Sequence, residues 1–195
     1  ELSIDNKIVL CSGRPARGLE KYYIELGLNT PLVSDNGAVI TFDYANKPHS
    51  RIYDVIDREV FFNFYFDIKD YKKSCFFSVG DNIYIDNRLE RLEVFYHITS
   101  KSNVFEGNFT EEMLKDTPYS LLFIIDGKKM DEFEKVIKEK YINYIGYRSF
   151  GNDSKNAIYE IFSKNVSKGN SVGKMQKHFG IDYDHTIVFG DHLND

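Results

Sequence analysis

Three short segments of this chain carry side chains with the chemistry needed to hold a phosphate ester. They are, in chain order, Ser12-Gly13-Arg14, then Lys168, and finally the cluster Asp191, Asn194 and Asp195. A serine hydroxyl and the backbone N–H groups of a helix start donate to phosphoryl oxygens. An ammonium group neutralises charge on a transferring phosphoryl group, and a carboxylate is a hard oxygen ligand for Mg²⁺. If the fold brings these segments together, they predict phosphate-ester chemistry.

The elements around the first segment predict a strand, a helix and a second strand. Residues 7–11, "KIVLC", form an apolar run rich in β-formers, which is typical of a buried parallel strand. Residues 16–26 place their large apolar side chains on one helical face, and Gly27 suits the helix end. The run 31–34 predicts another strand, and "DNGA", 35–38, predicts a turn. Together they indicate a βαβ unit.

The C-terminal part of the chain repeats this pattern. Residues 171–180 have helical periodicity, and the apolar run 186–189 predicts a buried strand. We therefore expect one parallel sheet with Leu10, Val33 and Val188 on central strands. Because ligands bind beyond the carboxyl ends of parallel strands, the three polar segments are predicted to meet at one edge of that sheet.

The middle of the chain predicts a different module. Residues 57–71 suit a helix, although a strand is also compatible with their pattern. A hairpin over 75–86, a strand at 121–127, a helix at 129–141 and a closing strand pair at 143–151 and 156–162 are expected after it. Strand pairs with helices between them indicate an antiparallel α+β module. The prediction is an α/β protein whose core, residues 1–42 and 164–195, is split by an α+β insert at 43–163.

Composition excludes several classes of protein. The chain has 195 residues, of which 42% are hydrophobic and 28% are charged. This composition is typical of a globular protein, and the chain is long enough to bury a hydrophobic core. A net charge of −5 argues against nucleic acid as a partner, because backbone binding requires a basic face. The two cysteines, Cys11 and Cys75, imply no disulfide framework and favour a cytoplasmic location. No apolar stretch approaches the roughly 20 residues of a membrane span, so no membrane partner is expected.

The motifs resemble those of one enzyme family. "CSGRP", "VSKG" and "FGDHLND" look like the second, third and fourth motifs of the haloacid dehalogenase-like hydrolases. "NGA", Asn36 to Ala38, is similar to the Cof-type sugar-phosphate phosphatases, in which it follows the second strand. The resemblance spans nearly the whole chain in order and spacing. It implies a Rossmann-like core, a cap domain at 43–163 and Mg²⁺-dependent phosphoryl transfer through an aspartyl-phosphate.

The resemblance also implies a role for each site residue. Ser12, with Gly13 and Arg14, would bind the phosphate group. Lys168 and Asp191 would be the catalytic residues, with Asp191 as the magnesium ligand. The remaining residues would contact substrate or support the site: Asn194 as a donor to phosphate or substrate, Asp195 as the partner of Lys168, and Asn36 in support.

The sequence departs from the family pattern in one respect. The family begins with a D-x-D-G-T/S motif that provides the nucleophile and the general acid–base, and these 195 residues contain no such motif. We therefore expect the nucleophile to lie outside this chain, the core to be incomplete and the 195-residue chain to be inactive by itself.

Several alternatives remain open at this stage. Ser12 by itself is typical of a helix N-cap, and Lys174 is an alternative to Lys168, although it falls inside the predicted helix. The favoured function is a phosphatase of a small phosphorylated metabolite such as a sugar phosphate, working as a monomer or weak homodimer. A phosphomutase, a sucrose- or trehalose-phosphate phosphatase, or a catalytically dead phospho-ligand-binding protein are the alternatives.

Overall fold

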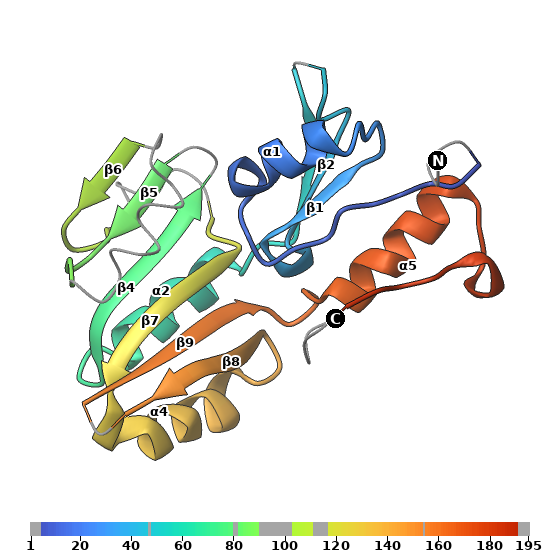
Figure 1. Cartoon of the computed structure of the whole chain (residues 1–195). Helices are drawn as coiled ribbons and strands as arrows, with labels where there is room; N and C mark the ends of the chain where they lie inside the picture. The colour runs from blue at the N-terminus through green and yellow to red at the C-terminus, as the bar shows by residue number, and fades with distance from the viewer. Residues whose placement is uncertain are drawn as a thin grey trace. The chain divides into compact units, whose positions relative to one another are not determined.

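The computed structural model describes residues 5–46, 48–79, 82–89, 103–110, 117–153 and 155–190 (Figure 1). The chain divides into two compact units. Unit 1 comprises Glu1–Asp54 with Asn165–Asp195, and unit 2 comprises Val55–Lys164. The first boundary thus falls twelve residues beyond the 42/43 junction expected from sequence, because β3 and the turn before it pack with unit 1.

Unit 1 contains a three-stranded antiparallel sheet in the order β1-β2-β3. The strands are β1 (Leu32–Ser34), β2 (Val39–Phe42) and β3 (Ser50–Tyr53), and the 3₁₀ turn η1 (Asp35–Gly37) joins the first two. In register, Val33 of β1 faces Ile40 of β2, which in turn faces Ile52 of β3. Val33 and Ile40 are buried, so this sheet forms the centre of the unit.

The N-terminal run follows β1 in parallel, as the βαβ prediction requires. The amide of Val33 donates to the carbonyl of Leu10 over 3.0 Å, and the amide of Ser12 donates to the carbonyl of Val33 over 3.0 Å. Only Cys11 forms a β-bridge, so the run is an extended segment and not a full strand. Helix α1 (Ala16–Glu25) connects the two segments and buries Leu19 and Tyr23. The strand–helix–strand path is therefore confirmed in outline.

Helix α5 (Lys168–Phe179) supplies the other layer of unit 1. The Ser167 side chain caps its start, and Gly180 ends it in the left-handed conformation at φ 67°. Glycine adopts that conformation without the Cβ clash that penalises other residues. Met175 on the buried face of the helix packs against Val33 and Ile40, which fixes α5 on the sheet.

The expectation that Val188 lies on a central strand is wrong for the described residues. The strands of unit 1 pair antiparallel, with the Cys11–Val33 bridge as the parallel contact. Residues 186–190 form no bridge to any described strand, and Val188 and Phe189 are 59% and 90% exposed. An apolar run becomes a buried strand only when a neighbouring strand and a covering layer exist, and periodicity alone does not show whether they do.

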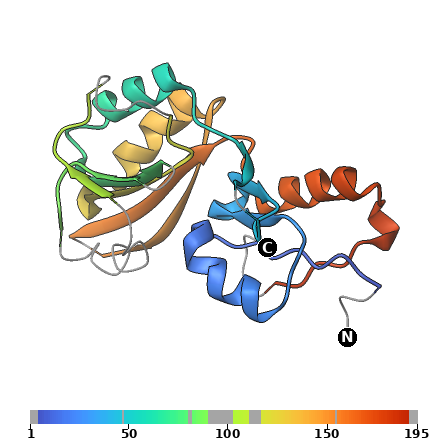
Figure 2. The same cartoon turned by 90° about the horizontal axis from the view of Figure 1, so that it is seen from above.

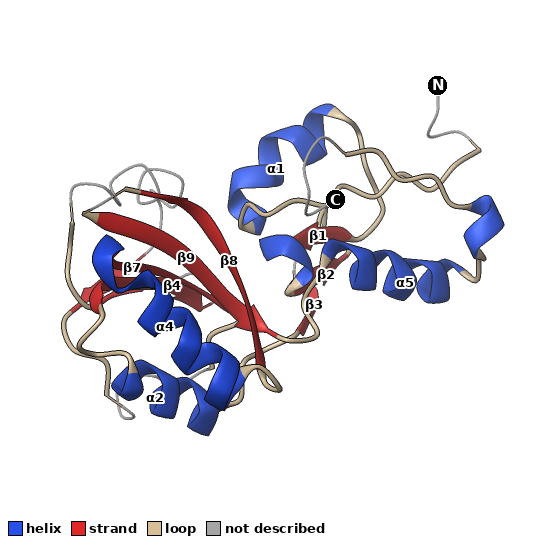
Figure 3. Cartoon of the chain, turned by 90° about the horizontal axis from the view of Figure 1, so that it is seen from below, coloured by secondary structure: helices blue, strands red, loops and turns tan. Residues whose placement is uncertain are grey.

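Unit 2 is built on a six-stranded sheet in the order β6-β5-β4-β7-β9-β8. Its strands are β4 (Lys72–Val79), β5 (Asn82–Ile85), β6 (Asn103–Glu106), β7 (Ser120–Asp126), β8 (Ile145–Asn152) and β9 (Asn156–Ser163). All neighbouring pairs run antiparallel except β5 and β6. Helices α2 (Arg58–Asp67) and α4 (Met130–Val136), the latter continued by η4 (Ile137–Tyr141), cover one face of the sheet (Figures 2 and 3).

An aromatic core fills the space between these helices and the sheet. Phe64 of α2 packs edge-on against Phe123 of β7, with ring centroids 5.7 Å apart, and Phe133 of α4 lies 4.8 Å from Tyr159 of β9. The segment 57–71, for which a helix or a strand was open, is helical over Arg58–Asp67. Asp57 caps the start of this helix, since its carboxylate accepts from the amides of Glu59 and Val60.

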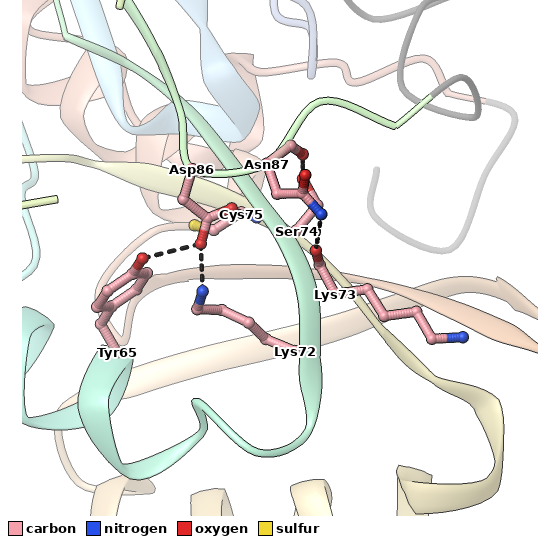
Figure 4. A network of polar contacts seen from close by, with 7 residues as sticks. All are labelled: Tyr65, Lys72, Lys73, Ser74, Cys75, Asp86 and Asn87. Carbon is pink, nitrogen blue, oxygen red and sulfur yellow. Dashed lines mark hydrogen bonds and ion pairs between the residues drawn. The ribbon is translucent and has the colours of Figure 1, made fainter. Parts of the chain in front are cut away.

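A buried polar network joins α2 to the β4–β5 hairpin (Figure 4). The Asp86 side chain, 1% exposed, accepts from the hydroxyl of Tyr65 over 2.8 Å and from the amide of Cys75 over 2.6 Å, and it pairs with the ammonium group of Lys72. Burial, with the Asp86 charge beside it, raises the pKa of Tyr65 well above its ordinary value. The carboxylate is thus compensated by three donors at the point where β5 ends.

We predict that Asp86→Ala lowers the free energy of unfolding by about 3–5 kcal/mol, because it leaves the partly buried Lys72 ammonium without its counter-ion and the Tyr65 hydroxyl and Cys75 amide without their acceptor. Urea denaturation followed by circular dichroism measures the change. Glu25→Ala is the control, since the Lys21–Glu25 pair on α1 is exposed and is expected to contribute less than about 0.5 kcal/mol. A loss below about 1 kcal/mol in Asp86→Ala would show that the network does not stabilise unit 2.

Candidate functional site

Two segments of unit 1 that carry predicted site residues lie on either side of the turn η1, which itself carries Asn36. The amide of Asn36 donates to the carbonyl of Ser12, and the amide of Asp35 donates to the carbonyl of Arg14, each over 3.0 Å. On its other side the turn touches the start of α5, where the hydroxyl of Ser171 lies 3.4 Å from the carbonyl oxygen of Gly37. The loop 12–14, the turn 35–37 and the helix start at Lys168 are therefore one local structure.

The loop Ser12–Arg14 is held close to the turn by a glycine. A Cβ atom on Gly13 would lie 2.8 Å from Oδ1 and 3.0 Å from Nδ2 of Asn36, so only glycine leaves room for that side chain. The amide of Arg14 donates to the hydroxyl of Ser12 over 3.2 Å. That hydroxyl accepts in this bond and so keeps its own hydrogen for donation, as binding of a phosphoryl oxygen requires.

The Arg14 side chain extends along α1 and is not fixed by the turn. Its Nη1 lies 3.4 Å from the hydroxyl of Tyr22, and its guanidinium carbon lies 5.8 Å from the Tyr22 ring centroid. Arg14 is exposed. An exposed guanidinium braced by an aromatic side chain can meet an anionic ligand with little loss of side-chain freedom.

The turn itself has an uncommon backbone. Asp35, Asn36 and Gly37 have φ values of 52°, 56° and 99°, three successive residues in the left-handed region. Asn, Asp and Gly tolerate this region best, which is why "DNG" suits the position. The Asn36 side chain is 5% exposed, so the strained turn is held by its packing and is not a mobile loop tip.

Lys168 is the first residue of α5, directly after the capping residue. The Ser167 hydroxyl accepts from the amide of Asn170 over 2.9 Å, which fixes where the helix begins. Lys174, the alternative lysine, lies six residues along the helix, about 9 Å by helical rise. Its ammonium group pairs with the carboxylate of Asp54, the last residue of the first segment of unit 1. The start of α5, where Lys168 lies, thus packs against the turn, and the ammonium group of Lys174 is engaged by Asp54.

The other predicted site residues lie outside the described residues: Asp191, Asn194 and Asp195. Their roles stay predictions. Within the ranges that the structure describes, no group of three or more His, Cys, Asp or Glu residues is arranged to hold a metal ion.

Ser171 is the residue at this site that sequence reasoning missed. Ser171 is 1% exposed, and its hydroxyl lies 3.0 Å from the carbonyl of Ser167 and 3.4 Å from that of Gly37. A small polar residue on the buried face of α5, three positions after Lys168, was the available signal. Nothing in its spacing indicated which segment it would touch.

The family model for haloacid dehalogenase-like hydrolase matches residues 3–195. The chain belongs to the haloacid dehalogenase-like hydrolase family. The family expected from "CSGRP", "VSKG" and "FGDHLND" is thereby confirmed, as is the expected class of hydrolytic enzyme.

Individual relatives of this haloacid dehalogenase-like hydrolase agree. A Bacillus subtilis protein named putative phosphatase YxeH is 26% identical over 210 residues, which cover 97% of this chain and 69% of the relative. A crystal structure from Thermotoga maritima superposes with a TM-score of 0.77 at 22% identity, covering 100% of this chain and 70% of that one. A structure described as a sugar phosphatase of subclass IIB has a TM-score of 0.65 at 22% identity and 92% and 65% coverage.

These structures confirm the α/β class of the fold. The hydrolase chain spans about two thirds of the length of the relatives that it matches. Over its described residues, no helix combines the length and apolar character that crossing a bilayer demands.

We predict that Gly13→Ala destabilises unit 1 by about 1–3 kcal/mol through overpacking against Asn36. In an Asn36→Gly background, which removes the obstructing side chain and tolerates the φ of 56°, the same substitution should cost less than about 1 kcal/mol. Urea denaturation of the four variants measures this coupling. Equal costs in both backgrounds would disprove the contact between Gly13 and Asn36.

Proposed function

We propose that this protein is a Mg²⁺-dependent phosphatase that hydrolyses a small phosphorylated metabolite, and specifically a sugar phosphate. The observation that carries the proposal is the assembly around η1. The Ser12–Arg14 loop and the Lys168 start of α5 meet at one turn, in a chain of the haloacid dehalogenase-like hydrolase family.

The similar proteins support the same chemistry. YxeH carries the name putative phosphatase, and the subclass IIB structure is described as a sugar phosphatase. A sugar phosphate also suits a net charge of −5, since a small phosphate group needs a local cationic site and not a basic surface.

Each residue of the site has a defined part in the proposed reaction. The Ser12 hydroxyl and the amides that follow it would bind the phosphoryl oxygens, and Arg14 would contact the substrate. Lys168 would neutralise the negative charge that the transition state gathers on those oxygens. The phosphoryl group would pass through an aspartyl-phosphate before reaching water.

The metal belongs to the same proposal. Asp191 is a hard carboxylate donor of the kind that Mg²⁺ prefers, and Asn194 and Asp195 would complete the loop by contacting phosphate and Lys168. Bound there, Mg²⁺ would supply electrostatic stabilisation of the phosphoryl oxygens.

The proposal also assigns a role to each of the two units. Unit 1 corresponds to the hydrolase core, which the sequence placed at 1–42 and 164–195, and unit 2 to the cap expected at 43–163. The cap would select the substrate beyond its phosphate group.

The first test replaces the site lysine in the complete gene product. Lys168→Ala should lower kcat for a sugar phosphate or p-nitrophenyl phosphate by about 10²–10³-fold, because it removes one preorganised cation from the transition state. Lys174→Ala is the matched control, since Lys174 lies on the same helix as Lys168 and its ammonium group is paired with Asp54, just after β3. It should leave kcat within about 3-fold. A large loss of kcat in Lys174→Ala with little loss in Lys168→Ala would show that the active site does not lie at η1. Tight phosphate binding without turnover in the unsubstituted protein would indicate a phospho-ligand-binding protein.

The second test concerns the metal in the complete gene product. Asp191→Asn should weaken Mg²⁺ binding at least about 10-fold, because an anionic ligand of a hard cation becomes neutral. Titration calorimetry with MgCl₂ measures the affinity. Asp184→Asn, an exposed aspartate seven residues earlier, serves as the control and should bind Mg²⁺ like the unsubstituted protein. Unchanged affinity in Asp191→Asn would remove Asp191 from the metal site.

A further inference from the structure

The turn η1 is packed tightly against the first turn of α5. Gly37 has φ 99°, and a Cβ atom placed on it would lie 2.6 Å from the carbonyl oxygen of Ser167 and closer still to the hydroxyl of Ser171. Neither neighbour can move away easily, because Ser167 caps the helix and Ser171 is 1% exposed. The backbone of the turn therefore sets how close the start of α5 can come.

The opposite side of the same turn is packed just as tightly. The Asn36 side chain lies against Gly13, where a Cβ atom would be 2.8 Å from its Oδ1. Two backbone hydrogen bonds, from Asn36 to Ser12 and from Asp35 to Arg14, tie the turn to the loop. Close-packed contacts of this kind transmit displacement instead of absorbing it.

We propose that Ser171 is a positioning residue that sets the place of Lys168 relative to the phosphate-binding loop, with the turn Asp35–Gly37 as the rigid spacer between them. This inference rests on the proposed function. Ser171 does not touch the substrate in this account. It acts through Lys168, which lies one helical turn before it on α5.

The chemistry of serine suits this position. The single hydroxyl hydrogen of Ser171 can be donated to the carbonyl of Ser167 at 3.0 Å, one turn back at the start of the helix, or to that of Gly37 at 3.4 Å, which links the helix to the turn. Its small side chain permits the close approach. A branched residue would push α5, and Lys168 with it, away from the turn. A misplacement of about 1 Å can cost on the order of 10²-fold in rate.

The test is a double-mutant cycle in the complete gene product, with p-nitrophenyl phosphate as substrate. Ser171→Val should lower kcat/KM about 10–100-fold when Lys168 is present, and less than about 3-fold in a Lys168→Met background. Ser171→Ala, which adds no bulk, should stay within about 5-fold of the unsubstituted protein. Equal losses from Ser171→Val in the two backgrounds would overturn the proposal, because a merely structural role lowers activity whether or not Lys168 is there.

Controls separate folding from positioning. Gly173→Ala adds a methyl group to the same helix where a Cβ atom meets nothing within 4 Å, and it should leave both the melting temperature and kcat/KM unchanged or slightly higher. If Ser171→Val does not fold, Ser171→Thr, which adds only one methyl group to serine, takes its place in the cycle.

A failure of the proposed function is recognised separately. If the unsubstituted protein does not hydrolyse phosphate monoesters, the phosphatase proposal fails. The same cycle is then read from the affinity for inorganic phosphate, measured by calorimetry. Loss of phosphate affinity in Ser171→Val that disappears in the Lys168→Met background would still support positioning, and additive losses would end it.

Discussion

Close packing of a left-handed turn between a loop and a helix start is the constraint on which the candidate site depends. Asp35, Asn36 and Gly37 all have positive φ, and the turn they form touches Gly13 on one side and the Ser167–Ser171 turn of α5 on the other. Segments 12–14 and 167–171 are about 155 residues apart in the chain, and this turn is what brings them to one place. Two glycines without Cβ atoms permit both approaches.

The two units use different physical means to reach a stable fold. Unit 1 has a short sheet whose strands contain three or four residues, and it relies on specific close contacts around η1. Unit 2 has a longer sheet and an aromatic core in which Phe61, Phe64 and Phe133 are almost fully buried. Such a core gains from many dispersion contacts at once. Among its polar contacts, the Lys72–Asp86 ion pair is completed by donors from Tyr65 and Cys75, so the buried carboxylate of Asp86 costs little as long as these partners remain.

Sequence reasoning was reliable where local signals agree. The helix at 16–25, the hairpin strands of unit 2 and the closing pair β8–β9 follow from periodicity, turn residues and caps. The motif residues Ser12, Gly13 and Arg14 were found from their type and position, and the structure places them with Asn36 and the helix that starts at Lys168. The prediction of a buried strand at 186–189 was wrong. Whether such a run is buried depends on neighbouring strands, and the local sequence carries no information about them.

The sequence by itself determined the family, the residue types that can bind a phosphate ester, and the left-handed character of "DNG", since each of these depends on local chemistry. Only the tertiary structure decided that Gly37 meets Ser171, that Gly13 makes room for Asn36, and that Lys174 is engaged by Asp54. The reason is physical. A close contact between distant segments depends on how whole helices and strands pack against each other. A short stretch of sequence is compatible with many such packings, and the hydrophobic core of the folded protein determines which of them forms.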